Sequence, residues 1–273
     1  MRISKAPPAA GQENDNGSSD SRGASVLVNA IEVLRCFTVE EPLQGVTEIA
    51  AKVGLHKSTV SRILATLEQE DLVERDQSSR RFRLGLGLIA VAGPLLADLD
   101  ERRAAYPVLQ ELGEQTGETT ALMVWNGSEA VSVEQIPSRQ QVKHTSVLGT
   151  RYNTALSASV QVFLAHEGTD RAGAMIRNGS IVLPGADGAG LDAYLLRLKE
   201  VEERGYAVNY GETSLEEVGV AAPVFDHRGN LAACAMVAAP RFRISAEQLQ
   251  AMAQACRQAA GKITVRLGGQ PPA

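Results

Sequence analysis

The sequence lacks the features that mark several classes of protein. Its net charge of −5 leaves no basic excess to draw the whole surface toward nucleic acid. Its three cysteines, Cys36, Cys234 and Cys256, lie far apart in apolar runs and fit neither a disulfide framework nor a metal-ligand spacing. No apolar run reaches the roughly 18 residues of a membrane span, and the N-terminus has no signal-peptide core. We therefore expect a cytoplasmic protein with buried thiols and no membrane partner, in which any DNA contact is local.

Motifs of common enzymes are also missing. The chain has no G-x-S-x-G, no H-E-x-x-H and no P-loop. The glycine-rich "GADGAG" at 185–190 does not stand between a strand and a helix, so we expect a loop there. The four histidines are scattered along the chain. These observations predict a protein that is not an enzyme and that uses neither a cofactor nor a metal.

A length of 273 residues predicts about two domains. The first 23 residues are polar and rich in glycine, proline and serine, a composition typical of disorder, and order is expected from about Ser25. The predicted division is a disordered arm at 1–23, a first ordered domain at 24–85, a linker helix at 86–103, a second ordered domain at 104–268, and a tail at 269–273.

The stretch "VTEIAAKVGLHKSTVSRILATLEQEDLVERD", from Val46 to Asp76, contains two short amphipathic helices that meet at Gly54. Thr47 is the predicted N-cap of the first helix, and Gly54 is a suitable left-handed stop. The second helix is expected from Lys57 to Glu70. It is followed by "LVER", "DQSS" and "RRFRLG", which predict a strand, a turn and a strand. Three helices and a β-hairpin together predict a winged helix-turn-helix.

The second of these helices has a polar, basic outward face. Serine, threonine and lysine side chains bind phosphate oxygens, as do the free N–H groups at a helix start. Arg62 has the reach to contact a guanine edge or a phosphate. The arginines at the tip of the hairpin suit the minor groove or the flanking backbone, although strand alternation directs only some of them outward. The predicted DNA contacts are Lys57, Ser58, Thr59, Ser61, Arg62, Arg80 and Arg81.

The remainder of the chain predicts an α+β layout. Strands are expected at 119–125 and 130–136, and a hairpin at 219–239. Helices are expected at 157–166, at 191–204 and after a Ser245–Gln248 capping box. Pro94 should kink or split the linker helix, and Pro107 suits the first turn of the next helix.

The chain resembles the IclR-type (isocitrate-lyase-regulator-like) bacterial transcription factors over about residues 24–268. The resemblance is carried by the stretch from Thr47 to Asp76 quoted above, and by "RRFRLGLGLI", "YPVLQELGEQTGETTALMV" and "VAAPVFDHRGNLAACAMVAAP". It implies a winged-helix domain, a linker helix and a C-terminal effector domain related to GAF sensors. It also implies homodimers, often paired as tetramers, on palindromic sites in double-stranded operator DNA.

In this family a small metabolite, often an organic acid or an aromatic-catabolism intermediate, binds at one end of the C-terminal sheet. Ala158 and Ser159 match positions whose backbone N–H groups commonly hold the effector carboxylate. The usual Gly-Lys pair that follows is replaced here by Val160-Gln161. The resemblance places the effector contacts at Leu156, Ser157, Ala158, Ser159, Asn209, Gly219, Met236 and Ala238.

Four of these positions depart from the family pattern. Asn209 replaces a usual aspartate, Gly219 a usual cysteine, and Met236 and Ala238 the serines of acid-binding members. Each change removes a charge or a hydroxyl. We therefore expect a roomier, more apolar pocket for a larger effector, such as an aromatic or acyl acid. The alternative is a pocket that is degenerate or not gated by a ligand.

The predicted function is a sequence-specific transcriptional regulator whose operator binding is modulated by a small-molecule effector. The alternative is a GAF-like sensor or enzyme whose helix-turn-helix mediates protein contacts. That alternative predicts turnover of a small molecule and no salt-dependent binding to DNA.

Overall fold

The computed structural model describes residues 17–98, 100–185 and 188–271, with side chains described from residue 25 onward except at 95–100 and 186–187. The chain divides into two compact units, Met1–Ala97 and Asp98–Ala273. The first helix, α1, spans Gly17–Arg35, so it begins well before Ser25. The predicted disordered arm is therefore wrong for residues 17–23, and its remaining residues lie outside those described.

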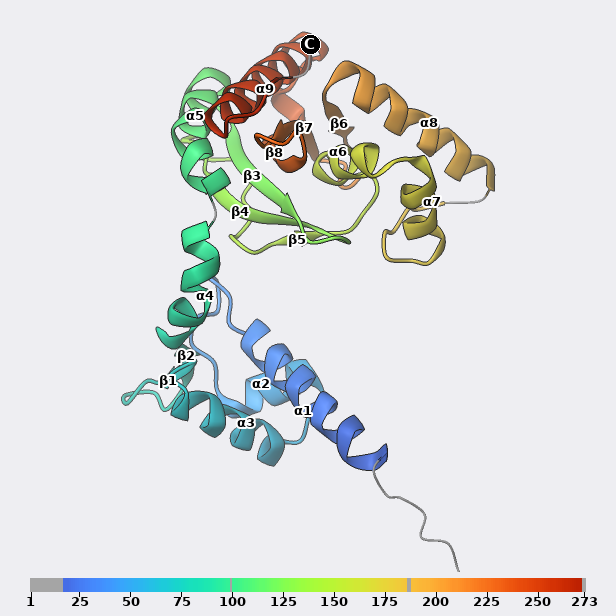
Figure 1. Ribbon diagram of the computed structural model, residues 1–273. Coiled ribbons are helices and arrows are strands. Elements are labelled where there is room, and N and C mark those ends of the chain that lie inside the picture. Colours follow the sequence, from blue (N-terminus) through green and yellow to red (C-terminus); the bar gives the residue numbers. More distant parts are fainter. Residues whose placement is uncertain (1–16, 99, 186–187, 272–273) are drawn as a thin grey trace, which may run out of the picture. The chain divides into compact units, whose positions relative to one another are not determined.

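The N-terminal unit contains helices α1 to α4 and a small β-hairpin (Figure 1). Val33, Ile49 and Leu64, one from each of its first three helices, are fully buried in a common core. Phe82 of the hairpin packs into the same core, as predicted. The winged helix-turn-helix is therefore confirmed. Its elements are α1, α2 (Val46–Val53), α3 (Lys57–Gln69), β1 (Val73–Arg75) and β2 (Phe82–Leu84), and the helix that follows the hairpin is α4 (Gly87–Asp98).

The helix-turn-helix ends are built slightly differently from the prediction. The N-cap of α2 is Gly45, not Thr47, and Glu48 Oε2 accepts the Gly45 N–H at 2.9 Å. Gly54 does end α2, with φ of 68°. The cap of α3 is His56, whose ring nitrogen accepts the Ser58 N–H. The sharp turn leaves the start of α3 exposed.

The C-terminal unit is a six-stranded antiparallel sheet with helices on both faces (Figure 1). The strand order is β5-β4-β3-β8-β7-β6. Helices α5 and α9 pack on one face, and α6, α7 and α8 cover the other. The elements are α5 (Asp100–Thr116), β3 (Thr119–Trp125), β4 (Ala130–Ile136), β5 (Arg151–Tyr152), α6 (Ala158–Glu167), α7 (Thr169–Arg177), α8 (Gly188–Arg204), β6 (Ala207–Tyr210), β7 (Glu217–Phe225), β8 (Leu231–Pro240), η1 (Arg241–Arg243) and α9 (Ala246–Arg266).

Several local predictions are wrong. Pro107 lies well inside α5 rather than in its first turn. Helix α4 continues past Pro94, so the helix is not split there, and the kink expected at that residue stays a prediction. The predicted loop at 185–190 contains the start of α8 at Gly188. Residue 269, assigned to a tail, is packed: the Gly269 N–H donates to Thr264 O at 2.9 Å.

Candidate DNA interface and effector site

The N-terminal half of α3 presents a polar face opposite its apolar stripe. Val60, Ile63, Leu64 and Leu67 are buried in the core of the unit. Lys57 and Arg62 are exposed, and neither forms an ion pair with any described residue. The first turn of α3 carries no acidic residue. The predicted contact residues Lys57, Ser58, Thr59, Ser61 and Arg62 are thus all exposed on one helix.

The tip of the wing is a closed turn organised by Asp76. Its carboxylate accepts hydrogen bonds from the Ser78 hydroxyl at 2.7 Å, the Ser79 N–H at 2.9 Å and the Ser79 hydroxyl at 2.5 Å. These bonds hold the pKa of Asp76 well below its usual range. The Arg80 N–H donates to Asp76 O, and Arg80 has a left-handed φ of 57°. The turn therefore fixes Arg80 in a backbone conformation that L-residues adopt at a cost.

The arginines of the wing differ in their partners. Arg81 pairs with Glu48 of α2 at 2.5 Å, and Arg83 pairs with Glu74 across the hairpin. Arg75 lies over the ring of Phe82. Arg80 has no ion-pair partner among the residues described. Of the two wing residues predicted to contact DNA, Arg80 is therefore free and Arg81 is bound to α2.

The predicted effector residues of the strands lie side by side at one end of the sheet. Asn209 pairs with Gly219, and Gly219 pairs with Ala238. A Cβ on Gly219 would lie 3.3 Å from Met236 Cε, 3.8 Å from Ala158 Cβ and 3.9 Å from Asn209 Cβ. The start of α6 thus meets the strands at this point, and five of the eight predicted residues belong to one cluster.

The polar groups among these residues are already engaged. Asn209 is 2% exposed, and its Oδ1 accepts the Glu212 N–H at 2.9 Å while its Nδ2 donates to the Thr213 hydroxyl. It therefore closes the turn that follows β6. The hydroxyls of Ser157 and Ser159 lie 3.1 Å apart, and both residues are buried. Leu156, which precedes the N-cap Ser157, is half-buried.

Gln161 of α6 was not among the predicted site residues. It is fully buried, and its Nε2 donates to Leu156 O at 2.9 Å and Val208 O at 3.3 Å. Its Oε1 has no hydrogen-bond partner among the described residues. The sequence offered a signal, because Gln161 is the polar residue inside the otherwise apolar run "VQVFLA".

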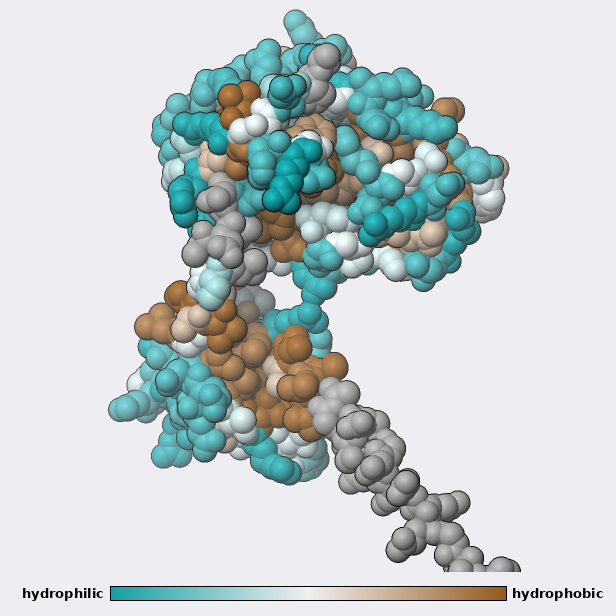
Figure 2. Space-filling model, viewed as in Figure 1, coloured by the Kyte–Doolittle hydropathy of each residue, from teal (hydrophilic) through white to brown (hydrophobic). Residues whose placement is uncertain are grey.

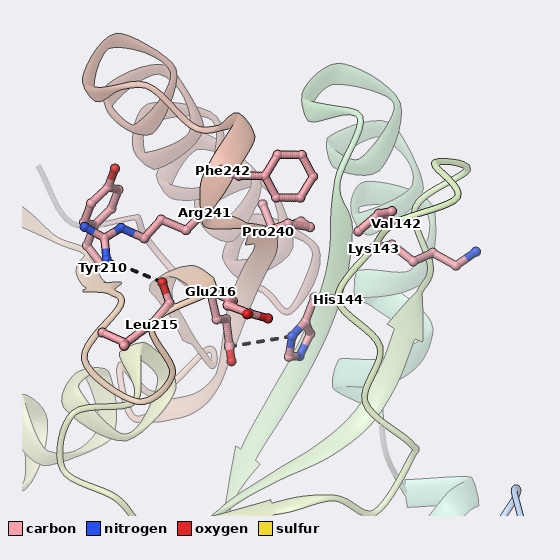
Figure 3. Close-up of a pocket in the computed structure, with 11 residues that line it drawn as sticks. Val142, Lys143, His144, Tyr210, Leu215, Glu216, Pro240, Arg241 and Phe242 are labelled. Carbon is pink, nitrogen blue, oxygen red and sulfur yellow. Dashed lines mark hydrogen bonds and ion pairs between the residues drawn. The ribbon is translucent and has the colours of Figure 1, made fainter.

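A groove of about 670 Å³ opens at the same end of the sheet (Figure 3). Its apolar side chains include Leu215 and Phe242, both strongly exposed. His144 Nδ1 lies 3.8 Å from Glu217 Oε1 at its base. The guanidinium of Arg241 stacks over the ring of Tyr210. None of the predicted effector residues lines this groove, and sequence reasoning did not single it out.

Two features are absent from the part of the chain that the structure describes. No group of three or more histidine, cysteine or acidic side chains is placed there to hold a metal ion. None of the helices in that part is long and apolar enough to cross a membrane. The three cysteines are free thiols and are buried.

A winged helix-turn-helix joined to a separate α+β unit defines a class of DNA-binding regulators. The model of the IclR helix-turn-helix domain matches residues 26–77, and the model of the bacterial transcriptional regulator IclR C-terminal domain matches residues 94–265. The chain therefore belongs to the IclR family of bacterial transcriptional regulators.

Individual relatives agree with this assignment. The HTH-type transcriptional regulator KipR of Bacillus subtilis is 29% identical over 249 residues, which cover 89% of this chain and 96% of that protein. A crystal structure of a domain from an IclR-family regulator is 62% identical, with a TM-score of 0.62, over 63% of this chain and 99% of that domain. An IclR homologue from Microbacterium hydrocarbonoxydans, crystallised with 4-hydroxybenzoate, shares the fold at 22% identity, with a TM-score of 0.73 over 89% of this chain and 98% of that one.

Proposed function

We propose that this regulator binds a specific operator through α3 and that a small acid bound in the C-terminal unit modulates this binding. The observation that supports operator binding is the exposed face of α3. Lys57 and Arg62 offer free charge there, and Ser58, Thr59 and Ser61 offer hydroxyls. In the major groove, these hydroxyls and the N–H groups at the helix start would bind phosphates, while Arg62 would contact a base edge or phosphate.

The wing would extend the contact beyond the major groove. Arg80 is exposed, unpaired among the described residues and held at the tip of a closed turn. An arginine in that position suits the minor groove or the adjacent backbone. Arg81 would support the wing through Glu48 rather than bind DNA with its full charge.

A homodimer would place two copies of α3 in successive major grooves about 34 Å apart. Apolar side chains gather on the visible face of the N-terminal unit (Figure 2). Helix α1 exposes Leu27 and Ile31, and the segment of α4 exposes Leu86, Ile89 and Val91. Exposed apolar surface of this kind is typical of an interface with another chain. A pair of such dimers would form the tetramer that the family resemblance implies.

The effector would bind at the junction of α6 with β6, β7 and β8. Gly219, Met236 and Ala238 present apolar surface there, and the N–H groups at the start of α6 would hold a carboxylate. A relative of the same fold is known with 4-hydroxybenzoate, which supports an aromatic acid as the effector class. An acid that favours one arrangement of the dimer would change operator affinity only by its differential affinity for that arrangement.

Selection of DNA by the purified full-length protein tests this proposal. Sheared genomic DNA from the source organism is bound, washed at increasing salt and sequenced. The expected result is a single enriched palindrome. In a second experiment, added acids should change the fraction of this palindromic DNA that the protein retains. Enrichment that is uniform across the genome, together with DNA binding that no acid changes, would contradict the proposal.

A further inference from the structure

The effector site contains one buried acceptor whose hydrogen bond is missing. Gln161 is 0% exposed, and its Oε1 has no partner in the part of the chain that the structure describes. Buried polar side-chain atoms in folded proteins are nearly always bonded, so an unsatisfied one points to a missing group. The side chain carries no charge, and its missing partner must be a hydrogen-bond donor.

The orientation of the Gln161 amide is fixed by its neighbours. Its Nε2 donates to two carbonyl oxygens, Leu156 O and Val208 O. Exchanging the amide nitrogen and oxygen would set Oε1 against both of these acceptors. The unpaired atom is therefore the oxygen, and a ligand that satisfies it must bring an O–H or N–H group.

The same place offers unpaired donors. Ser157 is the N-cap of α6, but its hydroxyl accepts no N–H group of the first turn, and the N–H groups of Ala158, Ser159 and Val160 have no acceptor among the described residues. Ala158, Ser159 and Val160 are at most 1% exposed, and Ser157 is 5% exposed. Because Gln161 bonds to Leu156, the residue just before that cap, its amide lies at this helix start. Free N–H groups and one free acceptor therefore occupy one buried spot.

We propose that the effector is an acid with a hydroxyl or N–H donor close to its carboxylate, and that Gln161 selects it through Oε1. The carboxylate would accept from the amides at the start of α6, and the neighbouring donor would bond to Gln161. The apolar part of the molecule would face Gly219, Met236 and Ala238. This inference rests on the proposed function, which places an acid at this site.

Replacing Gln161 with a cationic residue is not a clean test of the amide, because a second cation already contacts the same carbonyl. Val208 O also accepts from Arg197 Nη2 at 2.8 Å, and Arg197 pairs with Glu212 at 2.6 Å. A lysine at 161 would bring a second positive charge to the carbonyl that Arg197 already uses. Gln161→Met is the better test, because it removes the acceptor while nearly keeping the volume.

Calorimetric titration of the full-length protein with matched pairs of acids provides the test. The pairs are mandelate with phenylacetate, and 2-hydroxy-4-methylpentanoate with 4-methylpentanoate, which differ only in the hydroxyl beside the carboxylate. In at least one pair, the hydroxy acid should bind about tenfold more tightly, as expected for one satisfied buried hydrogen bond. In Gln161→Met the two acids of that pair should bind with equal affinity.

Ser132→Ala is the matched control. Ser132 Oγ is the other buried side-chain atom without a partner in the described residues, and it lies on β4 opposite Met123. The variant should keep the tenfold preference, and melting temperatures check that both variants fold. Equal binding of the acids by the wild type, or a preference that survives in Gln161→Met, overturns this inference and leaves the acid site standing. No binding of any of the four acids overturns the proposed acid site, and the inference with it.

Discussion

The guanidinium of Arg81 lies 2.5 Å from the carboxylate of Glu48 and ties the wing to α2. Arg81 Nη1 also donates to Leu43 O, before α2 begins. The neighbouring Arg80 has no such partner among the described residues. We therefore propose different roles for these two adjacent arginines: Arg81 holds the wing, and Arg80 offers its charge to DNA.

Arg80→Ala should weaken operator binding and lower the salt slope of log Kd by about 1, the effect of one lost phosphate contact. Arg81→Ala should instead lower the free energy of unfolding by about 0.2–1 kcal/mol, the usual contribution of an exposed ion pair. Binding titrations at several salt concentrations and urea unfolding measure both quantities. Equal salt slopes in the two variants would show that the assignment of roles is wrong.

Arg80→Gly separates backbone strain from charge at the same position. Glycine adopts the left-handed φ of 57° without the cost of roughly 1–2 kcal/mol that other L-residues bear. The variant should unfold at higher urea than Arg80→Ala and bind the operator equally weakly. If the glycine variant binds DNA as the wild type does, the Arg80 side chain makes no contact.

Arg62→Ala should raise the operator Kd by the equivalent of about 1–3 kcal/mol if Arg62 contacts a base edge bidentately. The loss should be largest for operators with the native base at the contacted position. Arg35→Ala is the control, because Arg35 is an exposed arginine of the same unit that already pairs with Glu32. Unchanged affinity in Arg62→Ala would mean that α3 is oriented differently on DNA.

Gly219→Ala should destabilise the C-terminal unit by about 1 kcal/mol, because its new methyl group would lie 3.3 Å from Met236 Cε. When Gly219→Ala is introduced into a Met236→Ala background, it should destabilise the unit less, because the methionine side chain is no longer in the way. The difference is a coupling energy of at least about 0.5 kcal/mol in a double-mutant cycle. Urea unfolding of the four proteins measures it.

Gly113→Ala is the matched control for this cycle. Gly113 lies inside α5, and its added Cβ would meet only ordinary contacts at 3.6 Å or more. This variant should gain stability, since alanine favours a helix over glycine by about 1 kcal/mol. Additive effects at 219 and 236 would contradict the close approach of these two residues.

Cys234 and Cys256 should resist thiol reagents in the folded protein. Burial raises the pKa of the Cys234 thiol well above its usual value and that of Cys256 to about 12. Because the folded pKa lies above the unfolded pKa of about 8.5, the unfolded protein loses its thiol protons first as pH rises. The free energy of unfolding is therefore unaffected by these thiols below about pH 8.5 and falls as pH rises toward 12. Reaction with a disulfide reagent at pH 8, with and without urea, measures the exposure. Rapid labelling of the folded protein would contradict the burial.

The sequence predicts most of the fold because its signals are local. The stretches "TTALMVW" and "AVSVEQI", on either side of the turn at Asn126-Gly127, predict β3 and β4 with their observed bounds. The capping box at Ser245 and the stop at Gly54 are also confirmed. Pro107 misled the prediction, because a proline suits the first turn of a helix, whereas α5 begins at Asp100 and continues through this residue.

The site was predictable only in part. The apolar stripe of α3 fixes which of its residues face outward, so the exposed face proposed to bind DNA follows from periodicity. The ion pair between Arg81 and Glu48 could not be predicted from periodicity, because the two residues are 33 positions apart in the chain. The unpaired Oε1 of Gln161 depends on two carbonyls from different elements, and the clustering at Gly219 depends on strand register. The relation to GAF sensors remains a prediction from resemblance.

The central claim is that the exposed face of α3 recognises one DNA sequence. Competition binding with an operator obtained by genomic selection tests it most directly, against the same fragment with its half-sites scrambled, at physiological salt. The account predicts binding to the operator at least about a thousandfold tighter than to the scrambled fragment, as typical specific regulators show. Equal affinity for the two fragments, with the same salt slope, would contradict it.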